Sequence, residues 1–404
     1  MLESDAAADA LQLTPRPRGL SSVLMRHVAR CDAGRLTIET PSGKVWSCRG
    51  SNDGPDARLT IHRWRALARL LVGGDLGFAE AYRLGDWTSP DLAAFFAWVT
   101  ANEQALSGAW SGAAALRAID RLRHARRANT KRGSRRNIAA HYDLGNDFYA
   151  AWLDDGMNYS SGLYLAAGES LEDAQRNKLD RVVEYLNLPP DAKVLDIGCG
   201  WGALVERLAK RAGRHVTGVT VSAEQRHYAQ RRLEQGGLSD RAHLRFQDYR
   251  DLDGQFDGIV SIEMLEAVGE RYWPVYFQKL RDLLKPGGHA VLQVITISDD
   301  RFASYRARPD FIQRFIFPGG MLPTKTHMRD QAAKAGLALV AEQYFPLSYA
   351  ATLAEWRRRF DGVRQQLEPM GYDENFCRLW EYYLAYCETG FRCGALDVGF
   401  YVLK

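Results

Sequence analysis

The sequence predicts an α/β fold: a Rossmann-like domain built on a parallel sheet, preceded by a smaller N-terminal α+β domain. Two observations lead to this prediction. From about residue 137, short apolar runs alternate with helical stretches, as a parallel sheet with crossover helices requires. Directly after the first apolar run the chain has Gly198, Gly200 and Gly202, at the point where open α/β sheets bind their ligands.

The N-terminal part of the chain has a different pattern. Residues 1–20 are small, polar and aperiodic, and we interpret them as a flexible tail. Residues 21–105 begin with two strands separated by Pro41-Ser42-Gly43 and continue with a third strand at 57–61. Helical runs follow at 62–72, 78–84 and 90–101. This region predicts a small accessory domain of mixed α and β structure.

Residues 106–136 are predicted to form a basic helical linker. Nine of the twenty residues in 117–136 are Lys or Arg, opposed by the single acid Asp120. A solvated interdomain helix explains this composition. A surface for anionic phospholipid headgroups explains it equally well, since each basic residue near such a surface contributes on the order of 1 kcal/mol. RNA binding ranks third, because the segment carries no aromatic stacking module.

Residues 137–404 are predicted to form the larger domain. Its expected strands are 194–197, 215–220, 242–246, 258–262 and 290–297. Lys285-Pro286-Gly287-Gly288 predicts the turn that leads into the fifth of them. Further strand signals lie at 337–340 and 400–403, and helices are expected at 352–367 and 375–385.

Charge and composition exclude several classes of protein. The formal net charge of +4 over 404 residues is nearly balanced, so nucleic acid is not an expected partner. The six cysteines show no C-x-x-C spacing, and no metal site is expected. No run of about 18 apolar residues occurs, so any membrane contact has to be peripheral. The chain shows no leading apolar signal segment, and we expect a cytoplasmic protein.

The glycine-rich turn predicts a site for a nucleotide-type cofactor. Glycine lets the backbone approach a ligand closely, and the N-terminus of the following helix attracts a carboxylate. The spacing is G-x-G-x-G with Asp196 two residues ahead, which differs from the dinucleotide fingerprint G-x-G-x-x-G. The next strand ends in Thr220 rather than in an acid. This pattern resembles the S-adenosylmethionine loop of class I methyltransferases.

Polar residues at the neighbouring strand ends suit the same cofactor. Asp196 can support the glycine-rich loop or meet the ammonium group of the methionine moiety. Thr220, Ser222 and Gln225 can hydrogen-bond the ribose in place of the usual acid. Asp248-Tyr249-Arg250 follows the third strand, where an adenine contact is expected, although a tyrosine there can also belong to the core.

A series of motifs resembles the cyclopropane fatty acid synthase family. They occur in the family's order as HYDLGNDFY, NYSSGLY, GCGWG, TVSAEQ and SIEMLEAVG, at 141–149, 158–164, 198–202, 220–225 and 261–269. The likeness continues through FIFPGG at 315–320 and YYL at 382–384, so it covers about 137–404. GFAEAY at 77–82 and GDW at 85–87 resemble the amino-terminal domain of the family's phospholipid-acting members.

The resemblance implies a catalytic domain over 137–404 that uses S-adenosylmethionine. Such enzymes transfer a one-carbon unit, methyl or methylene, to the cis double bond of an unsaturated phospholipid acyl chain through a carbocation. The resemblance also implies a homodimer that associates peripherally with the inner face of the membrane. The residues expected to bind the cofactor are Tyr159, Ser160, Asp196, Gly198, Gly200, Gly202, Thr220, Val221, Gln225, Asp248, Tyr249 and Ser261.

The family is further implied to hold a bicarbonate ion, which removes a proton from the new methyl group so that a cyclopropane closes. The implied catalytic residues around this ion are Ser161, Glu266, Gln293, Ile295 and Tyr349. Ser161 stands where the family has cysteine, and Gln293 stands where it has histidine. Ala267 also replaces a common histidine. An amide hydrogen-bonds an anion but does not titrate as imidazole does, so we expect mainly a methyl-branched unsaturated product, with a cyclopropane as the minor alternative.

A cation that forms in an apolar acyl pocket needs a negative group or an aromatic face close by. Glu266, Tyr159 and Tyr349 are the expected sources of that stabilisation. Glu263 lies three residues before Glu266 and can cap the following helix or meet the cofactor, so its role stays open.

Two other functions are compatible with parts of the sequence. A small-molecule methyltransferase would keep the cofactor loop but would not need the accessory domain or the basic linker. A non-catalytic, cofactor-binding membrane partner subunit would not need to retain Glu266 together with Tyr349.

Overall fold

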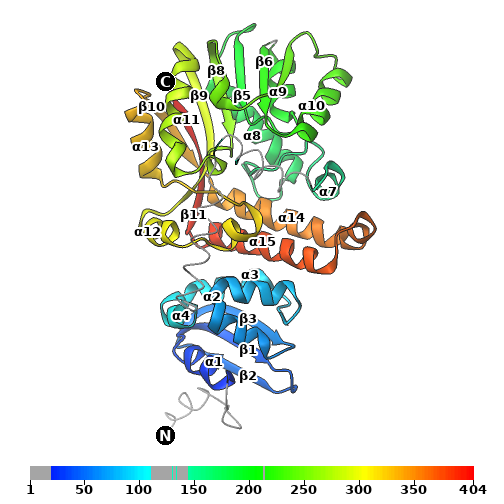
Figure 1. Cartoon of the computed structure of the whole chain (residues 1–404), viewed down its shortest axis with the longest axis vertical. Helices are drawn as coiled ribbons and strands as arrows, with labels where there is room; N and C mark the ends of the chain where they lie inside the picture. Colours follow the sequence, from blue (N-terminus) through cyan, green and yellow to red (C-terminus); the bar gives the residue numbers. More distant parts are fainter. Residues whose placement is uncertain (1–19, 111–129, 131–132, 134–143, 213) are drawn as a thin grey trace. The chain divides into compact units, whose positions relative to one another are not determined.

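The computed structural model describes residues 20–110, 130, 133, 144–212 and 214–404 (Figure 1). The predicted tail up to residue 19, most of the predicted linker at 106–136 and positions 141–143 of the first motif lie outside the described residues. Contacts divide the chain into two compact units, which we call unit 1 (Met1–Arg121 with Arg364–Cys393) and unit 2 (Leu122–Val363 with Gly394–Lys404).

Unit 1 contains a four-stranded sheet of order β2-β1-β3-β4. Its strands are β1 (Ala33–Glu39), β2 (Val45–Arg49), β3 (Asn52–Ile61) and β4 (Trp87–Thr88). β1 pairs antiparallel with β2 across the predicted turn and parallel with β3. The helices are α1 (Leu20–Val28), α2 (Arg65–Arg83), α3 (Leu92–Ala101), α4 (Glu103–Trp110) and α15 (Glu374–Arg392).

Helix α2 replaces two helices that the sequence pattern predicts at 62–72 and 78–84. It runs through both segments with a kink at Gly74, which has φ 62° and ψ −144°. Glycine tolerates this conformation because it has no Cβ. Leu70 before the kink and Phe78 after it are both buried, so the kink keeps the apolar side chains of both halves in the core.

Helix α15 belongs to unit 1, although the sequence pattern assigned it to the larger domain. The Tyr82 hydroxyl donates a hydrogen bond of 2.9 Å to Glu381 Oε2. The Tyr382 ring packs edge-on against Phe96, with 4.8 Å between the ring centroids. Periodicity predicts that this segment is a helix, but it does not say against which elements the aromatic face of the helix packs.

Unit 2 contains a seven-stranded sheet of order β10-β11-β9-β8-β5-β6-β7. The strands are β5 (Lys193–Ile197), β6 (His215–Thr220), β7 (Ala242–Phe246), β8 (Phe256–Ile262), β9 (Leu284–Ile297), β10 (Leu339–Tyr344) and β11 (Leu396–Leu403). β5 to β9 are parallel, and β11 pairs antiparallel with β9 and β10. All seven predicted strands are present. β9 starts earlier than predicted, so the expected turn at 285–288 lies within it.

The helices of unit 2 alternate with these strands along the chain. They are α7 (Asn146–Ala150), α8 (Leu171–Leu186), α9 (Ala203–Ala212), α10 (Ala223–Gln235), α11 (Trp273–Leu283), α12 (Asp299–Ala307) and α13 (Lys325–Lys334), and α14 (Pro346–Leu367) continues into unit 1. Short 3₁₀ segments lie at Tyr249–Asp251, Leu265–Ala267, Glu270–Tyr272 and Glu368–Met370, and a π-helical turn spans Ile312–Ile316.

The core of unit 2 lies between the sheet and these helices. Leu195, Ile259 and Leu292 from three adjacent strands are fully buried and pack in one cluster with Trp273 and Leu280 of α11. Parallel strands that are covered on both faces have nearly continuous apolar sequences, and for this reason the sequence pattern predicts where these strands lie. None of the helices within the described residues combines the length and apolar character needed to cross a bilayer.

Candidate active site

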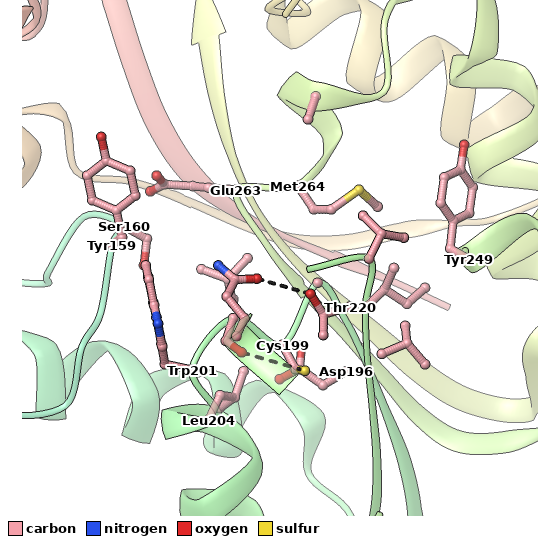
Figure 2. A pocket seen from close by; sticks show the side chains of 18 of the residues that line it. Tyr159, Ser160, Asp196, Cys199, Trp201, Leu204, Thr220, Tyr249, Glu263 and Met264 are labelled. Atoms are coloured by element: carbon pink, nitrogen blue, oxygen red, sulfur yellow. Dashed lines mark hydrogen bonds between the residues drawn. The ribbon is translucent and has the colours of Figure 1, made fainter. Parts of the chain in front are cut away.

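A pocket lies at the carboxyl ends of β5, β6 and β8 in unit 2 (Figure 2). Its walls come from residues within 157–160, 196–204, 219–225, 247–250 and 262–268, and from Lys178 and Leu179 on α8. This is the position that the glycine-rich turn predicts. Figure 2 shows Tyr159 and Glu263 on one side of the pocket and Tyr249 on the opposite side.

The glycine-rich turn joins β5 to α9 and requires its glycines. Gly198, Gly200 and Gly202 have φ values of 86°, 52° and 87°. A Cβ on Gly198 would lie 3.0 Å from Met264 Cγ, and one on Gly202 would lie 2.9 Å from the Ala229 Cβ. The turn is held to β6, because the backbone N–H groups of Gly198 and Cys199 both donate to the Val219 carbonyl. The backbone therefore passes close to the pocket without side chains that would fill it.

A buried charged pair lines the inner wall of the pocket. Asp196 at the end of β5 is 2% exposed, and burial raises the pKa of its carboxyl group to about 7. Lys178 on α8 is 1% exposed, and burial lowers the pKa of its ammonium group to about 8. Lys178 Nζ donates a 2.7 Å hydrogen bond to Ser160 Oγ. The predicted cofactor residues Asp196 and Ser160 thus share one wall with a cation that the sequence reasoning did not single out.

The predicted ribose-binding residues at the end of β6 form a local network. The Thr220 hydroxyl donates to Gln225 Oε1 at 3.0 Å and accepts from the Ser222 backbone N–H at 3.1 Å. Ser222 Oγ accepts from the Gln225 backbone N–H and caps α10. Thr220, Val221 and Gln225 line the pocket, whereas Ser222 supports them from the helix terminus.

The segment after β7 forms the opposite wall. Asp248 is buried and accepts two hydrogen bonds from the Arg250 guanidinium, at 2.8 and 2.7 Å. The buried hydroxyl of Tyr249 has no hydrogen-bond partner among the described residues. Both Asp248 and Tyr249 line the pocket, as predicted. Ser261 does not line it: its hydroxyl donates to the Ile197 carbonyl and joins β8 to β5.

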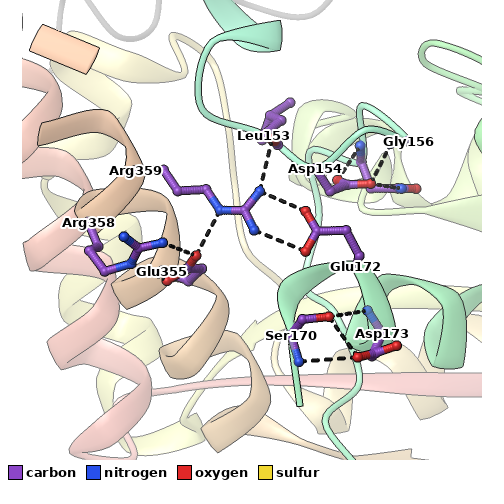
Figure 3. A network of polar contacts seen from close by, with 10 residues as sticks. Leu153, Asp154, Gly156, Ser170, Glu172, Asp173, Glu355, Arg358 and Arg359 are labelled. Carbon is purple, nitrogen blue, oxygen red and sulfur yellow. Dashed lines mark hydrogen bonds and ion pairs between the residues drawn. The ribbon is translucent and has the colours of Figure 1, made fainter. Parts of the chain in front are cut away.

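The loop before α8 carries Tyr159 and Ser160 into the pocket, and two polar clusters fix it (Figure 3). The Asp154 carboxylate accepts from the backbone N–H groups of Gly156 and Asn158 and from the Asn158 side chain, at 2.7 to 2.9 Å. Arg359 on α14 donates to the Leu153 carbonyl and to Glu172 on α8. The aromatic face of Tyr159 is positioned by this frame.

Three of the five predicted catalytic residues converge on Glu263. The Ser161 backbone N–H donates to Glu263 Oε1 at 2.9 Å, and Gln293 Nε2 donates to the same oxygen at 2.7 Å. The Tyr349 hydroxyl donates to Glu263 Oε2 at 2.7 Å. Glu263 lines the pocket and has a positive φ of 50°. The residue whose role the sequence left open therefore stands at the centre of the predicted catalytic group.

The other two predicted catalytic residues contact each other. The Ile295 backbone N–H donates to Glu266 Oε1 at 2.6 Å. Glu266 Oε2 is buried and has no hydrogen-bond partner among the described residues. Burial, and then the nearby charge of Glu263, raise the pKa of Glu266 to about 8. Glu266 is not among the residues that line the pocket.

Comparison with known proteins agrees with this geometry. The profile of the mycolic acid cyclopropane synthetase family matches residues 129–400. The chain belongs to this family. A tuberculostearic acid methyltransferase of Mycobacterium tuberculosis is 39% identical over 398 residues, which span 95% of this chain and 92% of the relative. A cyclopropane-fatty-acyl-phospholipid synthase of Escherichia coli K12 is 37% identical over 330 residues, spanning 80% of this chain and 81% of the relative.

Solved structures of family members share the fold. A cyclopropane synthase of Mycobacterium tuberculosis superposes with a TM-score of 0.63 at 29% identity and covers 67% of this chain and 97% of its own. A mycolic acid cyclopropane synthase in complex with SAH and CTAB gives the same TM-score, identity and coverage. The predictions of a cyclopropane synthase family member, of a class I methyltransferase fold and of a methyltransferase enzyme are therefore confirmed.

The pocket also suits the cofactor of the family. The solved member with SAH supports S-adenosylmethionine as the cofactor. Lys178 and the N-terminus of α9 suit the carboxylate of such a ligand, and Asp196 suits its ammonium group. The buried Tyr249 hydroxyl, which has no hydrogen-bond partner among the described residues, can hydrogen-bond a polar atom of a bound ligand. The residues that line the pocket therefore fit S-adenosylmethionine.

The sequence reasoning did not single out Lys178 and left the role of Glu263 open. Lys178 falls on the buried stripe of α8, with Ala174 and Val182 four residues to either side. A lysine on an otherwise apolar stripe is a signal that periodicity could have shown. Glu263 gave no comparable signal, because its direction depends on a backbone conformation that residue type does not predict.

Proposed function

We propose that the enzyme transfers a one-carbon unit from S-adenosylmethionine to the cis double bond of an unsaturated phospholipid acyl chain, by way of a carbocation. The observation that carries this proposal is the placement of Glu263, held by Tyr349, on the wall of a cofactor-type pocket that Tyr159 also lines. The name of the Escherichia coli relative, a cyclopropane-fatty-acyl-phospholipid synthase, supports a phospholipid substrate.

The chain's own residues supply binding and charge stabilisation. When bound, S-adenosylmethionine supplies an electrophilic methyl group. Adding that carbon to an alkene leaves a positive charge on the acyl chain, which is costly in an apolar environment. The Glu263 carboxylate lowers this cost, since opposite unit charges 4 Å apart attract by about 4 kcal/mol at an effective dielectric constant of 20.

Aromatic rings add to the stabilisation. Tyr159 lines the pocket, and its ring centroid lies 5.3 Å from that of Trp356 on α14. The Tyr349 ring lies 6.2 Å from the same tryptophan and meets it edge-on. The electron-rich faces of these rings attract a cation. A site of this kind suits a reaction in which positive charge builds up on a hydrocarbon chain.

We further propose that the main product is a methyl-branched unsaturated chain and that cyclopropane formation is minor. Gln293 and Ala267 stand where the resemblance implies histidines, so the site has no imidazole at these two positions. The name of a relative that acts as a tuberculostearic acid methyltransferase supports methyl transfer to a fatty acid. The implied route for removing a proton from the new methyl group uses a histidine beside the bicarbonate ion, and this chain has none there. The cation can instead lose a proton from a neighbouring carbon of the acyl chain, which leaves a double bond.

The product decides between these outcomes. The enzyme is expressed in cells with monounsaturated phospholipids, and the lipids are analysed by mass spectrometry and NMR. We expect a mass gain of one CH₂ with olefinic protons retained. Cyclopropane protons in the principal product would refute the branched-product proposal. Unchanged lipids would refute the proposal that unsaturated phospholipids are the substrate.

The membrane partner of the enzyme is also a proposal. The basic segment 117–136 lies almost entirely outside the described residues, so its charge in the sequence is what supports contact with anionic phospholipids on the cytoplasmic face. A homodimer would double this contact. Vesicle co-sedimentation at rising salt, with Arg126, Arg127, Lys131 and Arg132 changed to Gln, is expected to show weaker binding to anionic vesicles.

The same preparation separates the two other candidate functions. Formation of S-adenosylhomocysteine is measured with and without unsaturated phospholipid vesicles. The proposed function requires that vesicles stimulate turnover. Turnover with a water-soluble acceptor alone would indicate a small-molecule methyltransferase, and cofactor binding without turnover would indicate a non-catalytic partner subunit.

A further inference from the structure

We propose that the Glu263 carboxylate takes the place of the bicarbonate ion implied for this family and is itself the base that removes the proton from the methylated acyl chain. The enzyme then works without bicarbonate. This inference rests on the proposed function, because it names the proton acceptor of the same reaction.

Within the described residues, four of the five residues implied to hold a bicarbonate ion already direct their donors to the carboxylates of Glu263 and Glu266. Of the five residues implied to hold that ion, Ser161, Gln293 and Tyr349 already donate to the Glu263 carboxylate, at 2.7 to 2.9 Å. Ser161 has one backbone N–H and Tyr349 has one hydroxyl proton, so each donor is used. The second N–H of the Gln293 amide donates to the Ser161 carbonyl at 3.2 Å. Ile295, a fourth implied ligand, donates to Glu266.

A carboxylate and a bicarbonate ion present the same recognition features. Both are planar anions with two oxygen acceptors on one carbon, and both attract N–H and O–H donors from the same directions. Three donors that suit one of these anions therefore suit the other. In this chain the anion is part of residue 263, and the bicarbonate ion does not fit the residues present.

The backbone at Glu263 indicates that this placement is specific. Its φ of 50° is in the left-handed region, which residues with a Cβ rarely adopt. The conformation is held by a 2.8 Å hydrogen bond from the Glu263 backbone N–H to the Gln293 carbonyl on β9. Strained residues of this kind cluster at functional sites. The strain directs the side chain toward Tyr159 at the pocket wall, as Figure 2 shows.

Neighbouring charges favour an ionised Glu263 beside a protonated Glu266. Two carboxylates in one apolar region do not both ionise readily. Glu263 receives three hydrogen bonds and lies near the Lys178 ammonium group, whereas Glu266 receives one. Burial raises the pKa of Glu263 and outweighs these favourable contacts, and a carboxylate with a raised pKa is a better proton acceptor.

The step balances without a further reactant. A Glu263 oxygen takes a proton from a carbon bonded to the cationic carbon of the chain. The C–H bond breaks, and its electron pair forms a new C=C bond. The chain loses its positive charge, the carboxylate becomes a neutral carboxylic acid, and that acid returns its proton to solvent before the next turnover.

Two substitutions at position 263 separate the roles of charge and space. Glu263→Gln keeps the volume but removes the base. Glu263→Gly removes the side chain, tolerates the positive φ, and leaves the Ser161, Gln293 and Tyr349 donors facing an anion-sized space. Glu388→Gln is the matched control, because Glu388 is also a buried glutamate (2% exposed) but lies in unit 1.

Lipid methylation is measured in carbonate-stripped buffer with and without added bicarbonate. We expect the wild type and Glu388→Gln each to have the same methylation rate with and without bicarbonate. The rate of Glu263→Gln is expected to be lower by about 100-fold or more in both buffers, the usual range for a lost general base. Glu263→Gly is expected to be inactive in stripped buffer and to recover activity, with saturation, as bicarbonate is added. Wild-type turnover that falls on carbonate removal and returns on addition would overturn the proposal, as would a fully active Glu263→Gln.

Two measurements provide readouts that do not depend on turnover. Circular dichroism with thermal unfolding is expected to give the same spectrum and one cooperative transition for all four proteins, which shows that the variants are folded. NMR with ¹³C-bicarbonate is expected to show a bound signal with Glu263→Gly and none with the wild type, and a bound signal with the wild type would contradict the inference. If the wild type methylates no lipid in any buffer, the proposed function fails. If the wild type methylates lipid only when bicarbonate is present, the inference about Glu263 fails and the proposed function still stands.

Discussion

Replacing Tyr349 by Phe tests whether the Glu263 carboxylate controls the reaction. The substitution removes the hydroxyl that donates to Glu263 Oε2 at 2.7 Å and keeps the ring that packs on Trp356. A hydrogen bond to a charged group contributes about 1.5–3 kcal/mol, and this one also holds the carboxylate in place. Its loss lets the carboxylate turn away from the acyl chain, so Tyr349→Phe is expected to lower kcat by about 10- to 150-fold although Glu263 becomes a stronger base. KM for S-adenosylmethionine is expected to change little, because Tyr349 does not line the cofactor pocket.

The pH dependence of the same variant gives a second, independent result. The Tyr349 hydroxyl lowers the pKa of Glu263 against the opposing effect of burial. Without it, the pKa of Glu263 rises further, and the carboxylate is protonated at a higher pH. Activity that needs the ionised form is lost as pH falls through this pKa, so the acid limb of the pH–rate profile is expected to move to higher pH.

The assay is the initial rate of S-adenosylhomocysteine formation on unsaturated phospholipid vesicles between pH 5.5 and about 9, a span that brackets the ordinary pKa values of the groups involved. Tyr344→Phe is the matched control, because its hydroxyl also donates to a glutamate, Glu342 Oε2, at 2.9 Å, but on the edge strand β10. That control is expected to leave both kcat and the acid limb unchanged. An unaltered rate and profile for Tyr349→Phe would refute the reasoning.

Three further substitutions test other parts of the site. Gly198→Ala is expected to weaken S-adenosylmethionine binding and to lower the melting temperature, because alanine disfavours a φ of 86° and its Cβ would lie 3.0 Å from Met264; calorimetry and thermal unfolding measure the two effects. Lys178→Met is expected to reduce cofactor affinity at least about 10-fold through loss of a buried cation, and normal affinity in calorimetry would remove Lys178 from the binding site. Glu266→Gln is expected to flatten the pH dependence of stability between pH 4.5 and about 8. The folded pKa of about 8 lies above the ordinary 4.5, so the wild-type contribution is complete below 4.5 and is lost as pH rises through 8. Denaturant unfolding at pH 5, 7 and 9 checks this, and parallel profiles for the two proteins would contradict it.

The sequence predicts the sheet of unit 2 and the location of its ligand site. The central strands β9, β8 and β5 contain apolar runs, and the glycine turn after β5 fixes where the pocket lies. The pattern also locates the residues of the glycine turn, Thr220 and Gln225, because polar side chains at the carboxyl ends of adjacent parallel strands meet at one edge.

The sequence does not reveal which glutamate stands at the centre of the predicted catalytic group. Glu263 and Glu266 are three residues apart in one motif, and their directions depend on the positive φ at Glu263. Residue type alone favours a negative φ there, so local reasoning points away from the observed geometry. Ser222 and Ser261 show the reverse situation: both have the right chemistry for a ligand, but both hydroxyls are used inside the protein.

The discontinuity of unit 1 constrains how this protein can be synthesised and dissected. Because α15 at Glu374–Arg392 packs with strands and helices that end by Trp110, the aromatic surface formed by Phe96 and Tyr82 is not covered until nearly the whole chain has left the ribosome. A fragment that stops at residue 121 would expose that surface to self-association. A permuted chain that begins at α15 and continues into α1 would instead allow the same unit to complete early in translation.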